Sequence, residues 1–141
     1  MTANVLNVGV APSWMKKWSV VVAQVLLALV YLPGGWMKLT MEPALLAAQI
    51  PWATDVSEAF LRGIGMVDLA AGLGILLPTL TRIAPQWTVR AAIGSCLLQI
   101  CAMFFHGYRG EFGVIVMNLI IIALSVLVII GRQRWVPVSP R

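Results

Sequence analysis

Four apolar stretches, each long enough to cross a bilayer, constrain this sequence more than any other feature. They cover about residues 18–38, 60–80, 88–107 and 113–131. An α-helix needs about 20 apolar residues to span the hydrocarbon core of a membrane. Apolar residues make up 60% of the chain and charged residues only 11%, which leaves too little polar surface for a protein surrounded by water. The sequence therefore predicts an all-α protein with four membrane-spanning helices.

The connections between these stretches predict how the helices are arranged. The turns at Pro85 and at Gly110 are only a few residues long, so consecutive helices should pack antiparallel in a bundle. The connection 41–59 is too short and too interrupted to span, and its apolar run from Pro43 predicts a short helix that ends before Pro51. We expect this segment to lie at the membrane interface. The predicted parts are an N-terminal segment 1–17, the bundle 18–131 and a C-terminal tail 132–141.

Basic residues indicate the orientation, because Lys and Arg accumulate on the cytoplasmic side of membrane proteins. The predicted end that contains both termini has seven of them, and the opposite end has three. The seven are Lys16, Lys17, Arg82, Arg90, Arg132, Arg134 and Arg141; the three are Lys38, Arg62 and Arg109. This distribution predicts a multi-pass membrane protein with both termini in the cytoplasm.

Several classes of site are disfavoured by the residues present. The net charge of +5 is not accompanied by a basic stripe or a nucleic-acid motif, so we expect no nucleic-acid partner. One histidine and two cysteines are too few for a closed zinc site within one chain, and we expect no metal. Cys96 and Cys101 are five residues apart, on different faces of a helix, which disfavours a dithiol redox centre.

Polar and small residues recur along one face of each predicted span. Lipid cannot satisfy polar groups, so these faces should turn toward the interior of the bundle. Asp68 lies between Gly65 and Gly72, which would let a neighbouring helix approach closely. The other members are Gln24, Tyr31 and Lys38 in the first span, Ala92, Ser95, Gln99, Ala102 and His106 in the third, and Asn118 and Ser125 in the fourth.

The depth of these side chains locates a candidate site in the outer half of the bundle. At 1.5 Å per residue, four of them should lie roughly 8–12 Å below the outer boundary. These are Tyr31, Asp68, Gln99 and Asn118, beneath a charged rim of Lys38, Arg62, His106, Arg109 and Glu111. We expect a polar funnel that opens outward. Because the inner half is lined mainly by apolar residues, a continuous channel is not indicated.

Asp68 is the most informative of these residues. A carboxylate inside a membrane costs about 2.5 kcal/mol or more unless it is paired, and Lys38, Arg62 or Arg109 is its expected partner. A purely structural ion pair remains an alternative, and Gln99, Asn118 and Ser125 can serve simply as hydrogen-bonding contacts between helices. His106 close to Asp68 would form a proton relay.

The order of short motifs along the chain resembles the DoxX-like family of small bacterial membrane proteins, over about residues 18–132. The motifs are Gly35-x-x-Lys38, Arg62-x-x-Gly65-x-x-Asp68, Leu77-Pro78, His106-x-x-Arg109 and Asn118. In that family the acid of the second span is usually Glu, whereas here it is the shorter Asp68. The resemblance implies a bacterial inner membrane as the location. It also implies a four-helix membrane component associated with redox chemistry, since the name-giving relative is the small subunit of a thiosulfate:quinone oxidoreductase.

The predicted site combines the depth argument with this resemblance. Asp68 and His106 are the candidate catalytic residues. The candidate ligand-binding residues are Tyr31, Lys38, Arg62, Gln99, Arg109 and Asn118. These residues leave the cofactor unknown. A quinone fits the first of the functions below, because hydrogen-bond donors and proton carriers would surround its head group.

Three functions follow from this site. The first is a membrane subunit or accessory protein of a quinone-linked oxidoreductase, with a redox partner subunit on the outer side. The second is a non-catalytic protein that binds a membrane lipid or small molecule, or acts as a scaffold. The third is a stand-alone membrane enzyme that uses Asp68 and His106 for acid–base catalysis. The residues leave open whether the protein is an enzyme and whether it forms a homo-oligomer.

Overall fold

The computed structural model describes residues 12–141, and all of its regular structure is helical. Its elements are α1 (Ser13–Thr40), α2 (Pro43–Leu46), the 3-10 helix η1 (Pro51–Thr54), α3 (Glu58–Thr81), α4 (Gln86–Tyr108), α5 (Phe112–Ile130) and the π-helical turn η2 (Gly131–Trp135). The four long helices are long and apolar enough to cross a membrane. The predicted four-span, all-α fold is therefore confirmed. Most of the predicted N-terminal segment 1–17 lies outside the described residues.

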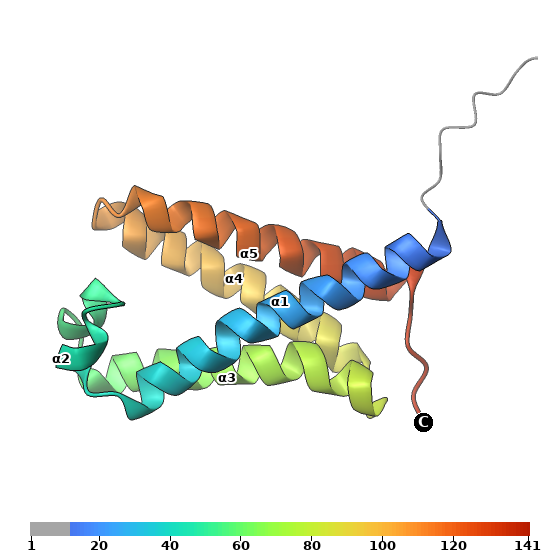
Figure 1. Ribbon diagram of the computed structural model, residues 1–141, viewed down its shortest axis with the longest axis horizontal. Helices are drawn as coiled ribbons and strands as arrows, with labels where there is room; N and C mark the ends of the chain where they lie inside the picture. Colours follow the sequence, from blue (N-terminus) through green and yellow to red (C-terminus); the bar gives the residue numbers. More distant parts are fainter. Residues whose placement is uncertain (1–11) are drawn as a thin grey trace, which may run out of the picture.

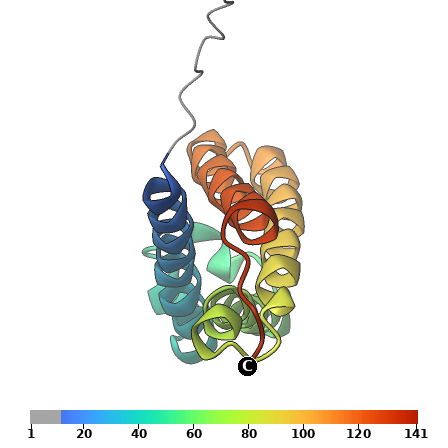
Figure 2. The ribbon, with the colours of Figure 1, turned by 90° about the vertical axis from the view of Figure 1, so that its right-hand side faces the viewer.

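The four long helices form an antiparallel bundle (Figure 1). Around the bundle α1 packs on α3, α3 on α4 and α4 on α5, and α5 returns to α1. We call the end that holds α2 and η1 the covered end. The opposite end, where α1 begins and where α3 meets α4, is the basic end; the C-terminal tail crosses it (Figure 2).

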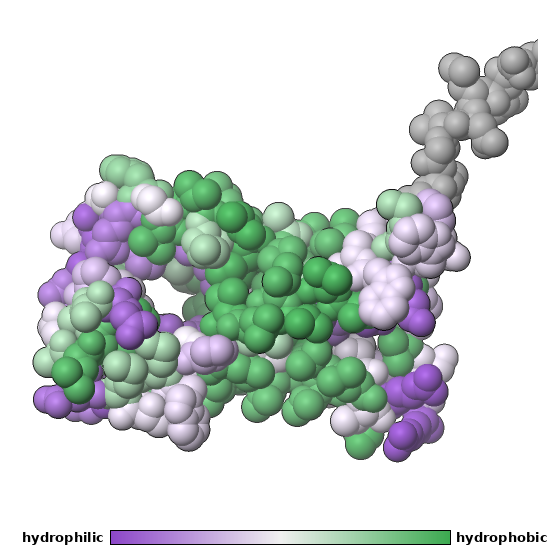
Figure 3. All heavy atoms as spheres, viewed as in Figure 1, coloured by the Kyte–Doolittle hydropathy of each residue, from purple (hydrophilic) through white to green (hydrophobic). Residues whose placement is uncertain are grey.

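The surface of the bundle is divided along its length (Figure 3). On the face shown, hydrophobic side chains cover the middle, and hydrophilic side chains gather at both ends. Many large apolar side chains point outward, among them Leu29, Leu97 and Val116, each about 60% exposed. The polar stripes predicted from the sequence are buried instead: Gln24, Asp68, Ser95, Gln99, His106, Asn118 and Ser125 all have exposures of 8% or less. Such an inverted surface is expected when the solvent is lipid.

The crossing of α1 and α3 depends on two glycines, Gly35 and Gly65. A β-carbon added to Gly35 would lie 2.8 Å from the carbonyl oxygen of Gly65 and 2.9 Å from the backbone nitrogen of Leu69. A β-carbon added to Gly65 would lie 3.0 Å from the β-carbon of Lys38. Any side chain at either position would separate the helices, because backbone atoms cannot move aside. The same close approach positions Lys38 beside α3.

Residues 41–57, which we call the covering segment, join α1 to α3 across the covered end. The segment contains the short predicted helix as α2, and Leu46 and Ala53 pack with Leu61 of α3 in a small buried cluster. Its last residue, Ser57, caps α3 by accepting a hydrogen bond from the backbone nitrogen of Phe60. The segment is therefore fixed to the bundle by its own apolar side chains.

Candidate functional site

The main cavity lies in the covered half of the bundle and has a volume of about 460 Å³. All four long helices and the covering segment contribute to its wall. Figure 3, which views the bundle from the side, shows an opening between the hydrophilic covered end and the hydrophobic middle. Most of the wall is apolar, including Val30, Phe60, Leu98 and Ile121. The polar lining residues are Tyr31, Lys38, Gln49, Asp68, Gln99, His106, Glu111 and Asn118.

Lys38 and Asp68 form an ion pair in the cavity wall. The Lys38 Nζ donates to Asp68 Oδ2 at 2.9 Å, and the two side chains are only 12% and 10% exposed. Lys38 therefore reaches from the end of α1 toward the middle of the bundle instead of toward water. Of the three cations expected to pair with Asp68, the structure selects Lys38. Each charge compensates the other, because burying either one without a partner in this environment would be costly.

A chain of hydrogen bonds runs from the cavity into the middle of the bundle. Gln99 Nε2 donates to the Tyr31 hydroxyl at 2.9 Å, and this hydroxyl lies 2.6 Å from Ser95 Oγ. Ser95 Oγ in turn lies 2.8 Å from Ser125 Oγ. These side chains come from α1, α4 and α5, so the chain holds three helices together and fixes the Tyr31 hydroxyl at the bottom of the cavity.

Asn118 differs from its neighbours because its amide nitrogen is not paired. The side chain lines the cavity and is 4% exposed, and its Nδ2 has no hydrogen-bond partner within residues 12–141. Buried polar groups are almost always paired, and an exception calls for an explanation. A 180° turn of the amide exchanges its nitrogen and oxygen, so Asn118 can offer either a donor or an acceptor to a ligand.

Charged residues close the cavity toward the covered end. Arg109 joins the covering segment to the turn after α4 by pairing with Asp55 and Glu111, each at 2.8 Å. Glu111 Oε2 also lies 2.6 Å from His106 Nδ1. These contacts with His106 and Arg109 hold the pKa of Glu111 below its usual value. The carboxylates of Glu111 and Asp55 raise the pKa of Arg109.

Aromatic packing reinforces this closure. Trp52 of η1 meets Phe105 of α4 edge to face, with ring centroids 5.7 Å apart. Phe105 also makes an edge-to-face contact with His106 at 5.4 Å. The covering segment is thus attached to α4 by one aromatic pair and one ion pair. The funnel expected to open outward is covered, and its opening is on the side of the bundle.

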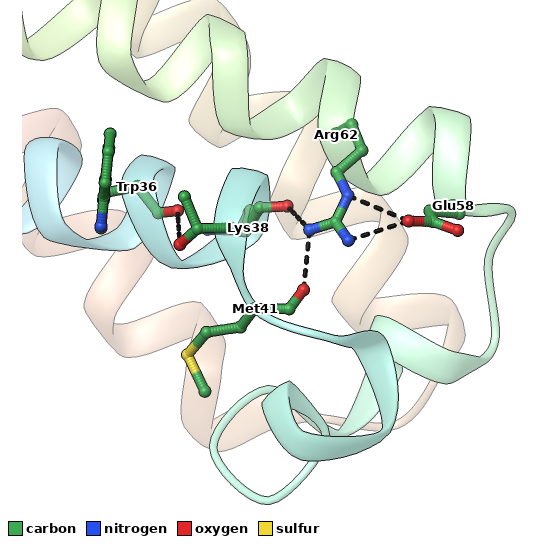
Figure 4. Close-up of polar contacts among 6 residues, drawn as sticks. Trp36, Lys38, Met41, Glu58 and Arg62 are labelled. Carbon is green, nitrogen blue, oxygen red and sulfur yellow. Dashed lines mark hydrogen bonds and ion pairs between the residues drawn. The ribbon is translucent and has the colours of Figure 1, made fainter.

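Arg62 binds backbone and not the cavity (Figure 4). Its Nη1 donates to the carbonyl oxygens of Lys38 at 2.6 Å and Met41 at 2.8 Å, while Nη2 pairs with Glu58 at 2.8 Å. The last carbonyl groups of a helix have no partner within it, so Arg62 caps the C-terminal end of α1. It ties this end to the start of α3.

The structure brings six of the eight candidate site residues together around the main cavity. Tyr31, Lys38, Asp68, Gln99, His106 and Asn118 all line it. Arg62 and Arg109 do not line it; they hold the α1 end and the covering segment in place. Asp68 and His106 are not bonded to each other, because Asp68 pairs with Lys38 and His106 with Glu111.

A model of the DoxX-like family matches residues 22–128. The chain belongs to the DoxX-like family. The matched region holds the main cavity and every residue of the hydrogen-bond chain. Comparisons of this DoxX-like protein with curated proteins and with solved structures gave no match.

Sequence reasoning missed one part of the wall of this DoxX-like cavity. Residues 49–52 of the covering segment contribute to it, and Trp52 is the member that contacts α4. The signal was present in the apolar Ile50-Pro51-Trp52 stretch, since apolar residues in a short connection usually pack on something. Within residues 12–141 no three His, Cys, Asp or Glu side chains are grouped to hold a metal ion.

Proposed function

We propose that the protein is a membrane subunit or accessory protein of a quinone-linked oxidoreductase, and that its main cavity binds a quinone head group. The observation that carries this proposal is the buried, unpartnered amide of Asn118 in the wall of an apolar cavity of about 460 Å³. Small-molecule sites are commonly apolar cavities of about 300–1,000 Å³ with few, well-placed polar groups.

The residues of the cavity fit a quinone in three respects. A quinone head is a flat, apolar ring with carbonyl oxygens that accept hydrogen bonds, and Asn118 and Lys38 supply N–H donors in the wall. The apolar lining suits the ring, and the opening on the side of the bundle suits a molecule that arrives through lipid (Figure 3). A bound quinone supplies an acceptor for two electrons and two protons.

The chain's own titratable groups are arranged to handle protons beside that ring. His106 contacts Glu111 through Nδ1, and its second ring nitrogen makes no hydrogen bond within residues 12–141, so in this proposal that nitrogen contacts the bound ring. Lys38 Nζ contacts Asp68 Oδ2 at 2.9 Å in the wall, so a carboxyl and an amine lie side by side next to the bound ring. Electrons would come from a partner subunit. The covered end has fewer basic residues, so the positive-inside rule places it on the outer side of the membrane. The partner subunit would bind there.

Non-catalytic binding of a lipid or small molecule is the second candidate. It is favoured by one observation: both predicted catalytic groups already have partners, Asp68 with Lys38 and His106 with Glu111. In this case Asn118 still contacts the ligand, but no proton transfer occurs.

Binding of decylubiquinone to the purified protein in detergent tests the site, with quenching of tryptophan fluorescence as the signal. Because Trp52 lines the cavity, a bound quinone should quench its fluorescence. For the wild type this quenching should reach saturation. Replacing Asn118 with Leu should weaken binding roughly five- to tenfold, the value of one hydrogen bond, without lowering thermal stability, since the lost group has no partner. The matched control is Gln133→Leu, which removes an exposed amide at the basic end.

Two outcomes would contradict the proposed site, and a second measurement separates the two candidate functions. Unsaturable quenching, or equal affinity for Asn118→Leu and wild type, would overturn the quinone site. To separate the two candidates, reduction of the bound decylubiquinone by a chemical donor is followed by absorbance in wild type and His106→Gln. Slower reduction in the variant supports the redox role, because reduction of the ring needs two protons as well as two electrons, whereas equal rates with intact binding support non-catalytic binding.

A further inference from the structure

A second pocket lies at the basic end, far along the bundle from the main cavity. It has a volume of about 480 Å³ and is formed by the ends of α3 and α4, by η2 and by the C-terminal tail. The tail covers it by folding back across this end, where the backbone nitrogen of Arg141 donates to the carbonyl oxygen of Arg82 at 3.2 Å (Figure 2). Arg90 and Arg132 are the two charged residues in its wall.

This end of the protein has basic side chains without acidic ones. All seven of the basic residues on this side lack a nearby Asp or Glu, because the five acidic residues of the chain are Glu42, Asp55, Glu58, Asp68 and Glu111. These acidic residues belong to the covered half. The guanidinium of Arg90 lies 4.7 Å from the ring of Trp87 and forms no ion pair within residues 12–141. Its positive charge is therefore available to an external anion.

Arg132 is held in place by neutral groups. Its Nε and Nη2 both donate to Gln24 Oε1, and Nη1 donates to the Val136 carbonyl oxygen. The Gln24 amide is itself fixed, since its Nε2 donates to the Ile75 carbonyl at 2.6 Å and to Thr79 Oγ1 at 2.9 Å. Arg132 is thus half-buried and oriented, but its charge is not neutralised. A partly buried cation of this kind is stabilised by a counter-ion.

We propose that this pocket binds the phosphodiester head group of an anionic phospholipid, with Arg90 and Arg132 as its ligands. Arginine is well suited to phosphate because its planar N–H donors match the phosphate oxygens. A lipid is favoured over free phosphate because α4 continues from Arg90 as an apolar stripe. Ile93, Leu97 and Ile100 lie on that face at helical spacing and are 45%, 60% and 44% exposed, which leaves a surface for an acyl chain.

Native mass spectrometry of the full-length protein in a neutral detergent tests this proposal, with dioleoylphosphatidylglycerol as the probe and dioleoylphosphatidylcholine as the neutral comparison. The wild type should retain phosphatidylglycerol in preference to phosphatidylcholine. Arg90→Gln should weaken retention by about tenfold or more, the effect of losing a charge-assisted hydrogen bond. Folding should persist, because Arg90 has no hydrogen bond within residues 12–141 to lose.

Arg134→Gln is the matched control, because Arg134 lies at the same end, is exposed and does not line the pocket. Its retention of phosphatidylglycerol should stay within about twofold of the wild type, since an exposed charge is screened. Equal losses for Arg90→Gln and Arg134→Gln would overturn the pocket in favour of a general surface potential. Displacement of the lipid by millimolar inorganic phosphate would overturn the assignment of the pocket to a lipid. None of these outcomes depends on quinone binding at the covered end.

Discussion

The two ends of the bundle differ in whether their basic side chains form ion pairs. At the covered end every Lys and Arg has a carboxylate partner: Lys38 pairs with Asp68, Arg62 with Glu58, and Arg109 with Asp55 and Glu111. At the basic end no Asp or Glu is present, and the most buried contact of Arg132 is with the neutral Gln24.

The difference supports the two proposals of an uncharged ligand in the main cavity and an anion at the basic end. Charges that are paired within the chain leave the main cavity nearly neutral, with the Asn118 amide as its unsatisfied group. This environment suits an uncharged, lipid-soluble molecule. Charges that are not paired within the chain need anions from outside, and the phosphates of membrane lipids are the nearest source.

Breaking the Lys38–Asp68 pair should have the largest effect. Asp68→Asn leaves the Lys38 ammonium, whose side chain is only 12% exposed, without an opposite charge. We expect a loss of about 3 kcal/mol in the free energy of unfolding, as for other buried pairs from which one partner is removed. Denaturation with an ionic detergent, followed by circular dichroism, measures it.

The double variant Lys38→Met with Asp68→Leu is the control, because it removes both charges and leaves neither uncompensated. It should recover most of the lost stability. If Asp68→Asn alone is as stable as the wild type, the ion pair does not hold α1 to α3.

The sequence predicted the fold and most of the polar residues of the cavity wall because lipid imposes simple rules. Helix lengths follow from bilayer thickness, and polar stripes must face inward, so Gln24, Asp68, Gln99 and Asn118 could be placed in the interior. The rise per residue along each helix then gave the depth of these side chains. These steps need no knowledge of tertiary contacts.

The misplaced residues are those whose direction depends on tertiary contacts. Arg62 was expected in the site, but its side chain turns to the end of α1 because unpaired carbonyl groups lie there. The pairing of Gln24 with Arg132 joins residues 108 positions apart, and depends on how α5 and η2 rotate against α1. The short helix of the covering segment was predicted. Its packing over the cavity was not, because that packing depends on the tertiary contact between Trp52 and Phe105.

Arginines at the two ends should respond differently to the same substitution. Arg62→Gln removes two hydrogen bonds to the end of α1 and the pair with Glu58. We expect a loss of about 2 kcal/mol in the free energy of unfolding, in the range for hydrogen bonds of charged groups. Arg134→Gln at the basic end removes an exposed side chain, and should change stability by less than about 0.5 kcal/mol. Equal effects would show that Arg62 does not cap α1.

Acid should loosen the covered end and leave the basic end unchanged, which is the smallest effect that we predict. The pKa of Glu111 lies below its usual value because of its contacts with His106 and Arg109. A carboxyl whose folded pKa is depressed contributes stability above its unfolded pKa, about 4.3 for Glu, and loses it as the pH falls through the folded pKa. Lowering the pH from about 5 to 3 should therefore weaken the link from Glu111 through Arg109 to Asp55.

Hydrogen exchange of the covering segment, corrected for the intrinsic effect of pH, measures this loosening. Protection of residues 41–57 should fall over that range, while protection of η2 stays constant, since no Asp or Glu side chain lies at the basic end. Glu111→Gln should remove most of the change, whereas Glu42→Gln, at an exposed residue of the same segment, should preserve it. If the pH dependence persists unchanged in Glu111→Gln, the link through Glu111 does not control the covering segment.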